Sequence, residues 1–340
     1  MFARHGVGIA AVGSYVPDGV RSAEEISAQS GLPLEMIRDH IGVHAVHVAA
    51  DDEHPSDMAV EAARVALERS EVDPDRVGVV IYASAGLLDA QVWSPAARVM
   101  DALGLRRGFG FEVRNNCAAA NVGATVAAGI MERDADVDAA IVVASDCMSR
   151  LADYSDPRLH LFYTFGDGAS AAVLRRDEPT NRLIGFAEHT DPSLNDAIVP
   201  WGGTRLAPDD PNALRLSRLQ LADPDGFTAR LGEGYVEHYG LAVQRALDHA
   251  GRRAADVDVV VINQLKPSLR DAVMDRLGVD RDRAVVFIDR YGHLGPADVW
   301  FGLDQAAQDG RIGPGSLVLL ASSGLGASWA ATVVEYHRAA

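Results

Sequence analysis

Val77-Gly78-Val79-Val80-Ile81 begins ten residues after the pair Ala66-Leu67, and Val257-Asp258-Val259-Val260-Val261 begins ten residues after Ala246-Leu247. The two copies are 180 residues apart, and no gap is needed to align them. Each copy predicts a helix, a charged turn and an apolar strand. Self-similarity of this kind indicates that the chain contains two related halves.

A second pair of apolar runs repeats in the same order. Ile141-Val142-Val143-Ala144-Ser145 resembles Val318-Leu319-Leu320-Ala321-Ser322 at a distance of 177 residues. Continuous apolar runs are typical of strands that are buried on both faces. Because strands alternate with helices in both halves, the pattern predicts an α/β fold. We place the boundary between the halves in the polar stretch 175–182, which gives halves of residues 1–176 and 177–340.

Each half is expected to contain a central helix that starts beside a reactive side chain. Residues 118–131 are small and apolar nearly all round, which predicts a helix buried on every side. The second central helix is expected after Gly292-His293-Leu294-Gly295-Pro296, where the proline suits a first helical turn. If the halves pack about a pseudo-twofold axis, Cys117 and His293 meet in the core. A thiol beside an imidazole is suited to nucleophilic catalysis, and the helix dipole favours the thiolate.

Composition and charge exclude several classes of protein. The chain has 340 residues, of which 48% are hydrophobic and 23% charged, as in ordinary globular proteins. A net charge of −17 argues against a nucleic-acid partner. No apolar run is long enough to span a membrane, and residues 1–5 do not resemble a signal peptide, so we expect a cytoplasmic protein.

No metal site is expected. The two cysteines, Cys117 and Cys147, are too few for a disulfide scaffold or a multi-thiolate site. His40, His44 and His47 have helical spacing, but Gly42 and Val43 interrupt that helix.

Five motifs in this chain occur together in one known superfamily. They are Gly13-Ser14-Tyr15-Val16-Pro17, Ile41-Gly42-Val43, Asn116-Cys117-Ala118-Ala119, Phe165-Gly166-Asp167-Gly168-Ala169 and Gly324-Leu325-Gly326-Ala327-Ser328-Trp329. In this combination the chain resembles the thiolase superfamily, and more closely β-ketoacyl-acyl-carrier-protein synthase III and its relatives in bacterial secondary metabolism. The resemblance covers essentially the whole chain, from Gly8 to Tyr336.

The resemblance implies a duplicated five-layer α/β/α/β/α fold, a homodimer and an acyl-cysteine intermediate on Cys117. The acyl donor would be a thioester of coenzyme A or of an acyl carrier protein, with no tightly bound cofactor. The backbone N–H groups of Cys117 and Leu325 would form the oxyanion hole.

Two positions depart from the pattern of the condensing members. These members carry a histidine at the end of the strand that here reads Val261-Ile262-Asn263-Gln264, and an asparagine in the turn that here reads Tyr291-Gly292-His293-Leu294. The histidine and the asparagine are therefore exchanged. An exchanged pair still suits acyl transfer, with His293 as general base and either Asp298 or Asn263 as the group that orients it.

Donor binding is expected to involve three residues. Met36 stands where condensing relatives commonly carry a tryptophan that stacks on the adenine of coenzyme A. Either its lack of a large π face favours a carrier-protein donor, or Met36 simply packs against its neighbours. Lys266, which is the only lysine, and Arg270 follow the Asn263 strand together with Arg276. In so acidic a chain, these cations form either a local dock for an acidic carrier protein or a solvated helix face.

The arrangement resembles a smaller branch of this family, found in antibiotic biosynthesis, that acylates sugar or other hydroxyls without forming carbon–carbon bonds. The resemblance therefore implies an acyltransferase that moves an acyl group through Cys117 to a hydroxyl or amine of a small-molecule acceptor. Two alternatives stay open. One is a decarboxylating condensing enzyme that uses the exchanged pair, and the other is a catalytically idle relative that acts as a binding subunit.

Overall fold

The computed structural model describes residues 6–90, 92–178, 180–195, 198–200, 219–221 and 224–336. The strands of the main sheet are β1 (Val7–Tyr15), β4 (Val77–Ser84), β5 (Phe109–Arg114), β6 (Ala139–Cys147), β7 (Asp167–Arg176), β8 (Arg182–Thr190), β11 (Val259–Ile262), β12 (Ala284–Val285), β13 (Ser316–Gly324) and β14 (Ser328–Tyr336). Two short pairs lie outside it: β2 (Val20–Ser22) with β3 (Ala45–His47), and β9 (Ile198–Pro200) with β10 (Leu219–Leu221). The helices are α1 (Ala23–Ser30), α2 (Pro55–Ser70), α3 (Pro95–Ala102), α4 (Ala119–Arg133), α6 (Pro224–Ala250), α7 (Pro267–Leu277), α8 (Ile288–Tyr291) and α9 (Asp298–Gln308).

The order of the strands repeats the duplication seen in the sequence. From one edge to the other it is β12-β11-β13-β14-β8-β1-β7-β6-β4-β5, so the five strands on one side mirror the five on the other. β4 pairs in parallel with β5 and β6, and β11 pairs in parallel with β12 and β13. The repeated apolar runs are thus the equivalent strands β4 and β11, and β6 and β13. The halves join where Gly8 of β1 pairs with Arg182 of β8.

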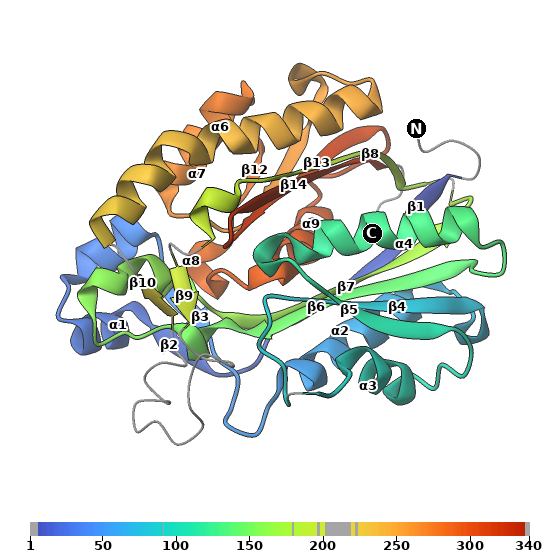
Figure 1. The fold of residues 1–340 in the computed structure, drawn as a ribbon, viewed down its shortest axis with the longest axis horizontal. Coiled ribbons are helices and arrows are strands. Elements are labelled where there is room, and N and C mark those ends of the chain that lie inside the picture. The colour runs from blue at the N-terminus through green and yellow to red at the C-terminus, as the bar shows by residue number, and fades with distance from the viewer. Residues whose placement is uncertain are drawn as a thin grey trace.

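The helices form three layers around the two halves of the sheet (Figure 1). α4 and α9 lie between the halves, α2 and α3 cover the outer face of one, and α6 and α7 cover the outer face of the other. The predicted duplicated five-layer α/β fold is therefore confirmed. The predicted boundary at residues 176 and 177 falls between β7 and β8, and the division into halves there stays a prediction.

Small side chains allow α4 to lie close to the sheet. A Cβ placed on Gly123 would come within 2.9 Å of the Val142 side chain, so only glycine fits without a shift. The prediction that this helix is buried on every side is wrong in detail, because Val122, Thr125 and Val126 are only partly buried. These three residues share one face that no other element of the described chain covers fully.

Both central helices begin at the same end of the molecule. Cys117 lies in a short 3-10 helix, Asn116–Ala118, that leads into α4. His293 lies just before another, Gly295–Ala297, that leads into α9. The duplication therefore places two reactive side chains at equivalent points of the core. In the described part of the chain, no helix combines the length and apolar character needed to cross a bilayer.

Candidate active site

Cys117 is held in a constrained turn at the end of β5. The preceding residue, Asn116, has φ = 49°, a left-handed conformation that is uncommon outside glycine. The Asn116 side chain stabilises this turn by donating from Nδ2 to the carbonyl oxygen of Leu325 at 2.5 Å. Cys117 itself is only 5% exposed. The turn therefore presents a single buried thiol at the start of α4.

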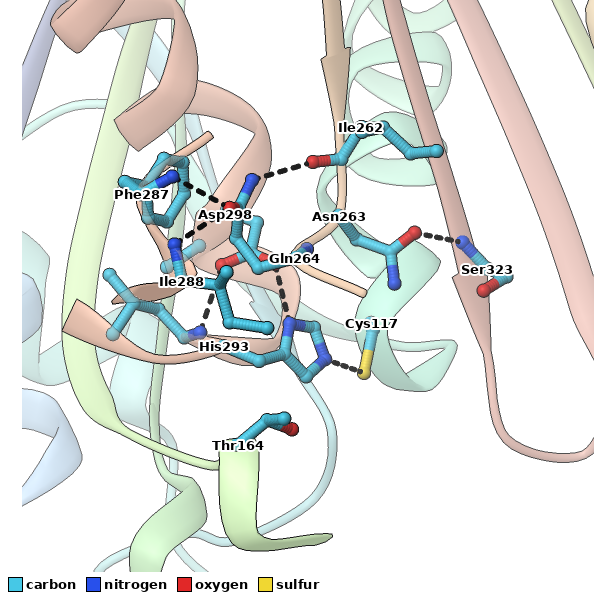
Figure 2. Close-up of polar contacts among 12 residues, drawn as sticks. Cys117, Thr164, Ile262, Asn263, Gln264, Phe287, Ile288, His293, Asp298 and Ser323 are labelled. Carbon is cyan, nitrogen blue, oxygen red and sulfur yellow. Dashed lines mark hydrogen bonds and ion pairs between the residues drawn. The ribbon is translucent and has the colours of Figure 1, made fainter. Parts of the chain in front are cut away.

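The imidazole of His293 reaches this thiol across the molecule. Its Nε2 lies 3.1 Å from the Sγ of Cys117 (Figure 2). The His293 backbone is fixed by an N–H that donates to the Thr164 carbonyl at 2.6 Å and by a carbonyl that accepts from the Gly166 N–H at 3.0 Å. The Phe165 ring packs against the imidazole, with centroids 5.7 Å apart. The Phe165–Ala169 motif thus supports the histidine as well as forming a turn.

Asp298 is the group that contacts the other side of the imidazole. Its Oδ2 lies 2.5 Å from Nδ1 of His293 and also accepts the Gln264 N–H at 2.6 Å. Its Oδ1 accepts the Leu294 N–H at 2.8 Å. Asp298 is fully buried, so these three donors replace the water that a carboxylate requires. Of the two groups considered from the sequence, it is Asp298 and not Asn263 that meets Nδ1.

The charges of this site favour a protonated imidazole. Burial disfavours the imidazolium, but the neighbouring Asp298 carboxylate and the Cys117 sulfur outweigh burial, so the pKa of His293 is raised well above its ordinary value. An imidazolium that donates to sulfur is the arrangement that stabilises a cysteine nucleophile. A Cys–His–Asp set with these contacts can transfer acyl groups.

Asn263 lies beside the thiol but has other partners. It is 3% exposed and forms part of the cavity wall next to Cys117. Its Oδ1 accepts from the Tyr239 hydroxyl at 2.5 Å and from the Ser323 N–H at 3.1 Å. Figure 2 shows its amide nitrogen on the side that faces Cys117. The exchanged residues therefore belong to one site, in which His293 contacts the Cys117 sulfur and Asn263 lines the cavity beside that sulfur.

A largely apolar cavity opens onto the sulfur. Its walls include Ile41, Leu161, Phe162, Leu194, Leu265 and Leu269. Its polar lining includes Thr164, Lys266, Cys117, His293 and Asn263. An apolar cavity with a few convergent polar groups is typical of a small-molecule site.

The turn after β13 closes the cavity next to the thiol. A Cβ placed on Gly324 would lie 2.8 Å from the Asn115 carbonyl oxygen and 3.2 Å from the Cys117 nitrogen, so a glycine is needed for this approach. Leu325 and Cys117 both line the cavity. The two N–H groups expected to form the oxyanion hole therefore belong to segments that pack against each other.

The residues expected to bind the donor lie in different surroundings. Met36 is 39% exposed and is not part of the cavity wall, whereas Ile41 of the same short helix is. Lys266 lines the cavity. Arg270 forms an ion pair with Asp271 at 2.8 Å, and Arg276 forms one with Glu237 at 2.9 Å. Of the three cations, Lys266 is the one that faces the cavity without an ion pair in the described residues.

Three residues near the reacting groups were not identified from the sequence. Gln264 accepts the N–H groups of Phe287 and Ile288 at its Oε1 and donates from Nε2 to the carbonyls of Ile262 and Val285. Tyr235 lines the cavity, and Tyr239 holds Asn263. The spacing of four between the two tyrosines was a usable signal, because it places them on one face of a helix.

The remaining cysteine and histidines show no such arrangement. Burial raises the pKa of the Cys147 thiol, as expected for an inert core cysteine. His40 lies in the short helix Met36–Ile41, while His47 lies in β3 and contacts the Pro17 carbonyl through Nδ1. No group of three potential metal ligands occurs among the residues that the structure describes.

The fold and the site together define a member of the thiolase superfamily. A model described as 3-Oxoacyl-[acyl-carrier-protein (ACP)] synthase III matches residues 111–192, and its C-terminal counterpart matches residues 247–336. The β-ketoacyl-acyl-carrier-protein synthase III of Escherichia coli (strain K12) is 30% identical over 328 residues, which cover 96% of this chain and 99% of that protein. The chain belongs to the 3-oxoacyl-acyl-carrier-protein synthase III family.

Solved structures agree with this assignment. The synthase III of Thermus thermophilus has a TM-score of 0.84 and 28% identity, with 98% of this chain and 100% of that chain covered. The priming β-ketosynthase from the R1128 polyketide biosynthetic pathway has a TM-score of 0.86 and 25% identity, with 99% and 98% covered. The family predicted from the motifs is confirmed.

Proposed function

We propose that this protein is an acyltransferase. It takes an acyl group from a coenzyme A or acyl-carrier-protein thioester onto Cys117 and passes it to a hydroxyl or amine of a small molecule of secondary metabolism. The observation that carries this proposal is the line of contacts Cys117 Sγ–His293 Nε2 at 3.1 Å and His293 Nδ1–Asp298 Oδ2 at 2.5 Å. The chemistry requires an acyl-thioester substrate and no bound metal or prosthetic group.

In the acylation step, the Cys117 thiolate attacks the carbonyl carbon of the donor. The carbonyl oxygen becomes negative and is stabilised by the N–H groups of Cys117 and Leu325. The donor's C–S bond then breaks, and its thiolate takes the proton from the His293 imidazolium. The products are acyl-Cys117 and a free thiol, with neutral His293 ready to act as a base.

In the transfer step, Asp298 keeps Nδ1 of His293 protonated and Nε2 free to accept a proton. Nε2 removes the proton of the acceptor, whose oxygen or nitrogen attacks the acyl carbon. The bond between the acyl carbon and Sγ breaks, and the electron pair returns to sulfur. The thiolate and imidazolium of the resting site are restored.

A condensing reaction is the second candidate, because relatives are named β-ketoacyl-acyl-carrier-protein synthase III and priming β-ketosynthase, and both Asn263 and His293 line the cavity with Cys117. In favour of acyl transfer, the Asp298 carboxylate on Nδ1 suits His293 to the removal of a proton from an acceptor. Incubation with a malonyl thioester separates the two reactions. Acyl transfer predicts that the carboxylate is retained in an ester or amide product, whereas release of carbon dioxide with a β-keto product would establish condensation and refute the proposal.

Donor recognition is proposed to depend on Lys266. Lys266 lines the largely apolar cavity and directly precedes α7. Its charge suits the phosphate groups of coenzyme A or of a carrier-protein arm. Since Arg270 and Arg276 are neutralised by acidic neighbours, Lys266 rather than a broad basic surface would provide the attraction.

We also propose that two copies of the chain form a homodimer through β5. This strand is at the edge of the main sheet, and Phe109 on it is 47% exposed. Trp93 is 39% exposed, and the partly buried face of α4 with Val122 lies next to β5. An open edge strand that carries an exposed aromatic side chain is a surface that proteins normally cover. Phe109→Asp is expected to convert a dimer to a monomer in light scattering; an unchanged mass would refute this interface.

A further inference from the structure

Two tyrosines of α6 reach the end of β11 beside the thiol. Tyr239 is 1% exposed, and its hydroxyl donates to Oδ1 of Asn263 at 2.5 Å. The Ser323 N–H donates to the same oxygen at 3.1 Å. Tyr235 is engaged differently, because its hydroxyl forms a hydrogen bond with the Oγ of Ser323. Neither tyrosine has a role in the acyl transfer described above.

These contacts determine which way round the Asn263 amide lies. A backbone N–H can only donate, so the atom that meets Ser323 must be the amide oxygen. Burial raises the pKa of Tyr239 well above its ordinary value, which keeps its phenol protonated and able to donate. The amide nitrogen is consequently directed toward Cys117 (Figure 2). The hydroxyl of Tyr235 forms its hydrogen bond with the Oγ of Ser323 instead.

We propose that Tyr239 is a positioning residue that, together with the Ser323 N–H, holds the Asn263 amide with its nitrogen toward the reacting groups, so that Asn263 only donates to the second substrate. This inference rests on the proposed acyl transfer, and it specifies which kind of acceptor atom the site prefers. Asn263 meets the acceptor atom while His293 removes that atom's proton. The site therefore selects an oxygen acceptor over a nitrogen acceptor.

The selectivity follows from the number of lone pairs. A hydroxyl oxygen has two, so one accepts from Nδ2 of Asn263 while the other attacks the acyl carbon. Its proton moves to Nε2 of His293, the new C–O bond forms, and the C–S bond to Cys117 breaks with its electrons on sulfur. A neutral amine has a single lone pair. An amine that accepts from Asn263 has no pair left for the attack.

The test compares an oxygen and a nitrogen acceptor of the same shape. Wild-type protein is acylated with acetyl-coenzyme A, freed of small molecules, and mixed with phenol or aniline, both uncharged at neutral pH. Loss of the acetyl group from the protein is followed by intact mass spectrometry, and the products are quantified. Hydrolysis by water, the smallest oxygen acceptor, is measured in the same samples and provides a readout for every variant.

The inference is tested by measuring the ratio of transfer to phenol and to aniline in three variants. Tyr239→Phe removes the phenol and should lower transfer to phenol relative to aniline by about tenfold, the effect of about one hydrogen bond. Asn263→Leu should lower that ratio at least as much, with hydrolysis falling in parallel. Tyr82→Phe is the matched control, because Tyr82 is an equally buried tyrosine whose hydroxyl donates to the Ser145 carbonyl, away from the cavity wall. It should leave the ratio unchanged.

The outcomes separate this inference from the proposed function. If Tyr239→Phe and Asn263→Leu reduce phenol, aniline and water reactions by the same factor, Tyr239 has only a structural role and the inference is overturned, while acyl transfer stands. If the wild-type protein forms no acyl adduct with acetyl-coenzyme A or with any other thioester tested, the proposed function is refuted, and this inference is refuted with it.

Discussion

Nε2 of His293 lies 3.1 Å from Sγ of Cys117, although 176 residues separate the two along the chain. The contact joins the two halves of a duplicated fold at equivalent ends of their central helices. A contact between a buried imidazole and a buried thiol is not needed for stability, because apolar side chains would fill the same space without the free-energy penalty of burying polar groups. The relationship is therefore best explained by chemistry at the sulfur.

His293→Ala is expected to separate the two steps of the reaction. Loss of a general base typically lowers a rate by about 10²–10⁴, so transfer to the acceptor should fall by that factor. Some adduct should still form on Cys117, because the thiol and the oxyanion hole remain. Single-turnover mass spectrometry measures both steps. Unchanged transfer would remove His293 from the mechanism.

Asp298→Asn should lower transfer by about 10²-fold or more while the fold is retained. The asparagine has nearly the same shape, but it lacks the charge that favours the imidazolium and it presents an N–H₂ to one of the donors now bound. The retained fold is checked by circular dichroism. Asn263→Ala is the comparison: if it, and not Asp298→Asn, changed the pH dependence of the transfer rate, Asn263 would be the orienting group.

The sequence predicted the fold well because buried parallel strands are continuous apolar runs, and these runs survive the duplication as β4 and β11, and β6 and β13. The sequence also predicted that Cys117 and His293 lie close together, because equivalent positions in duplicated halves meet at a pseudo-twofold axis. It left open whether Asp298 or Asn263 meets the imidazole, because that choice depends on side-chain directions. Tyr239 and Gln264 were missed for the same reason. The sequence does not show that the Tyr239 hydroxyl contacts Asn263, or that the Gln264 side chain accepts the N–H groups of Phe287 and Ile288.

Lys266→Ala should weaken donor binding without changing the chemical step. We expect the KM for an acyl-coenzyme A donor to rise by about threefold to tenfold with kcat nearly constant, and the difference should shrink at high salt. Arg276→Ala is a suitable control, because Arg276 already pairs with Glu237 and does not line the cavity. An equal rise in KM for both variants would argue for a general charge effect.

Asp146 is expected to make the free energy of unfolding depend on pH. It is fully buried, and although it accepts hydrogen bonds from the Ala85 N–H and the Ser84 hydroxyl, burial raises its pKa to about 7. Between about pH 4 and that value the folded chain holds a proton that the unfolded chain has lost. The free energy of unfolding therefore decreases as pH rises, by about 1.4 kcal/mol per pH unit from this group.

Urea unfolding at pH 5 and pH 7 measures this contribution. Asp146→Asn stays neutral and should show a smaller decrease than the wild-type protein between the two values. Asp101→Asn changes a carboxyl whose side chain is 75% exposed, so it should behave like the wild type. Equal pH dependence in all three proteins would show that Asp146 is ionised in the folded state.

The most direct measurement is the mass of the intact protein after incubation with an acyl thioester such as acetyl-coenzyme A. One acyl group per chain is expected on the wild-type protein and none on Cys117→Ala. An adduct that persists in Cys117→Ala, or a wild-type protein that acquires no acyl group from any thioester tested, would contradict the account.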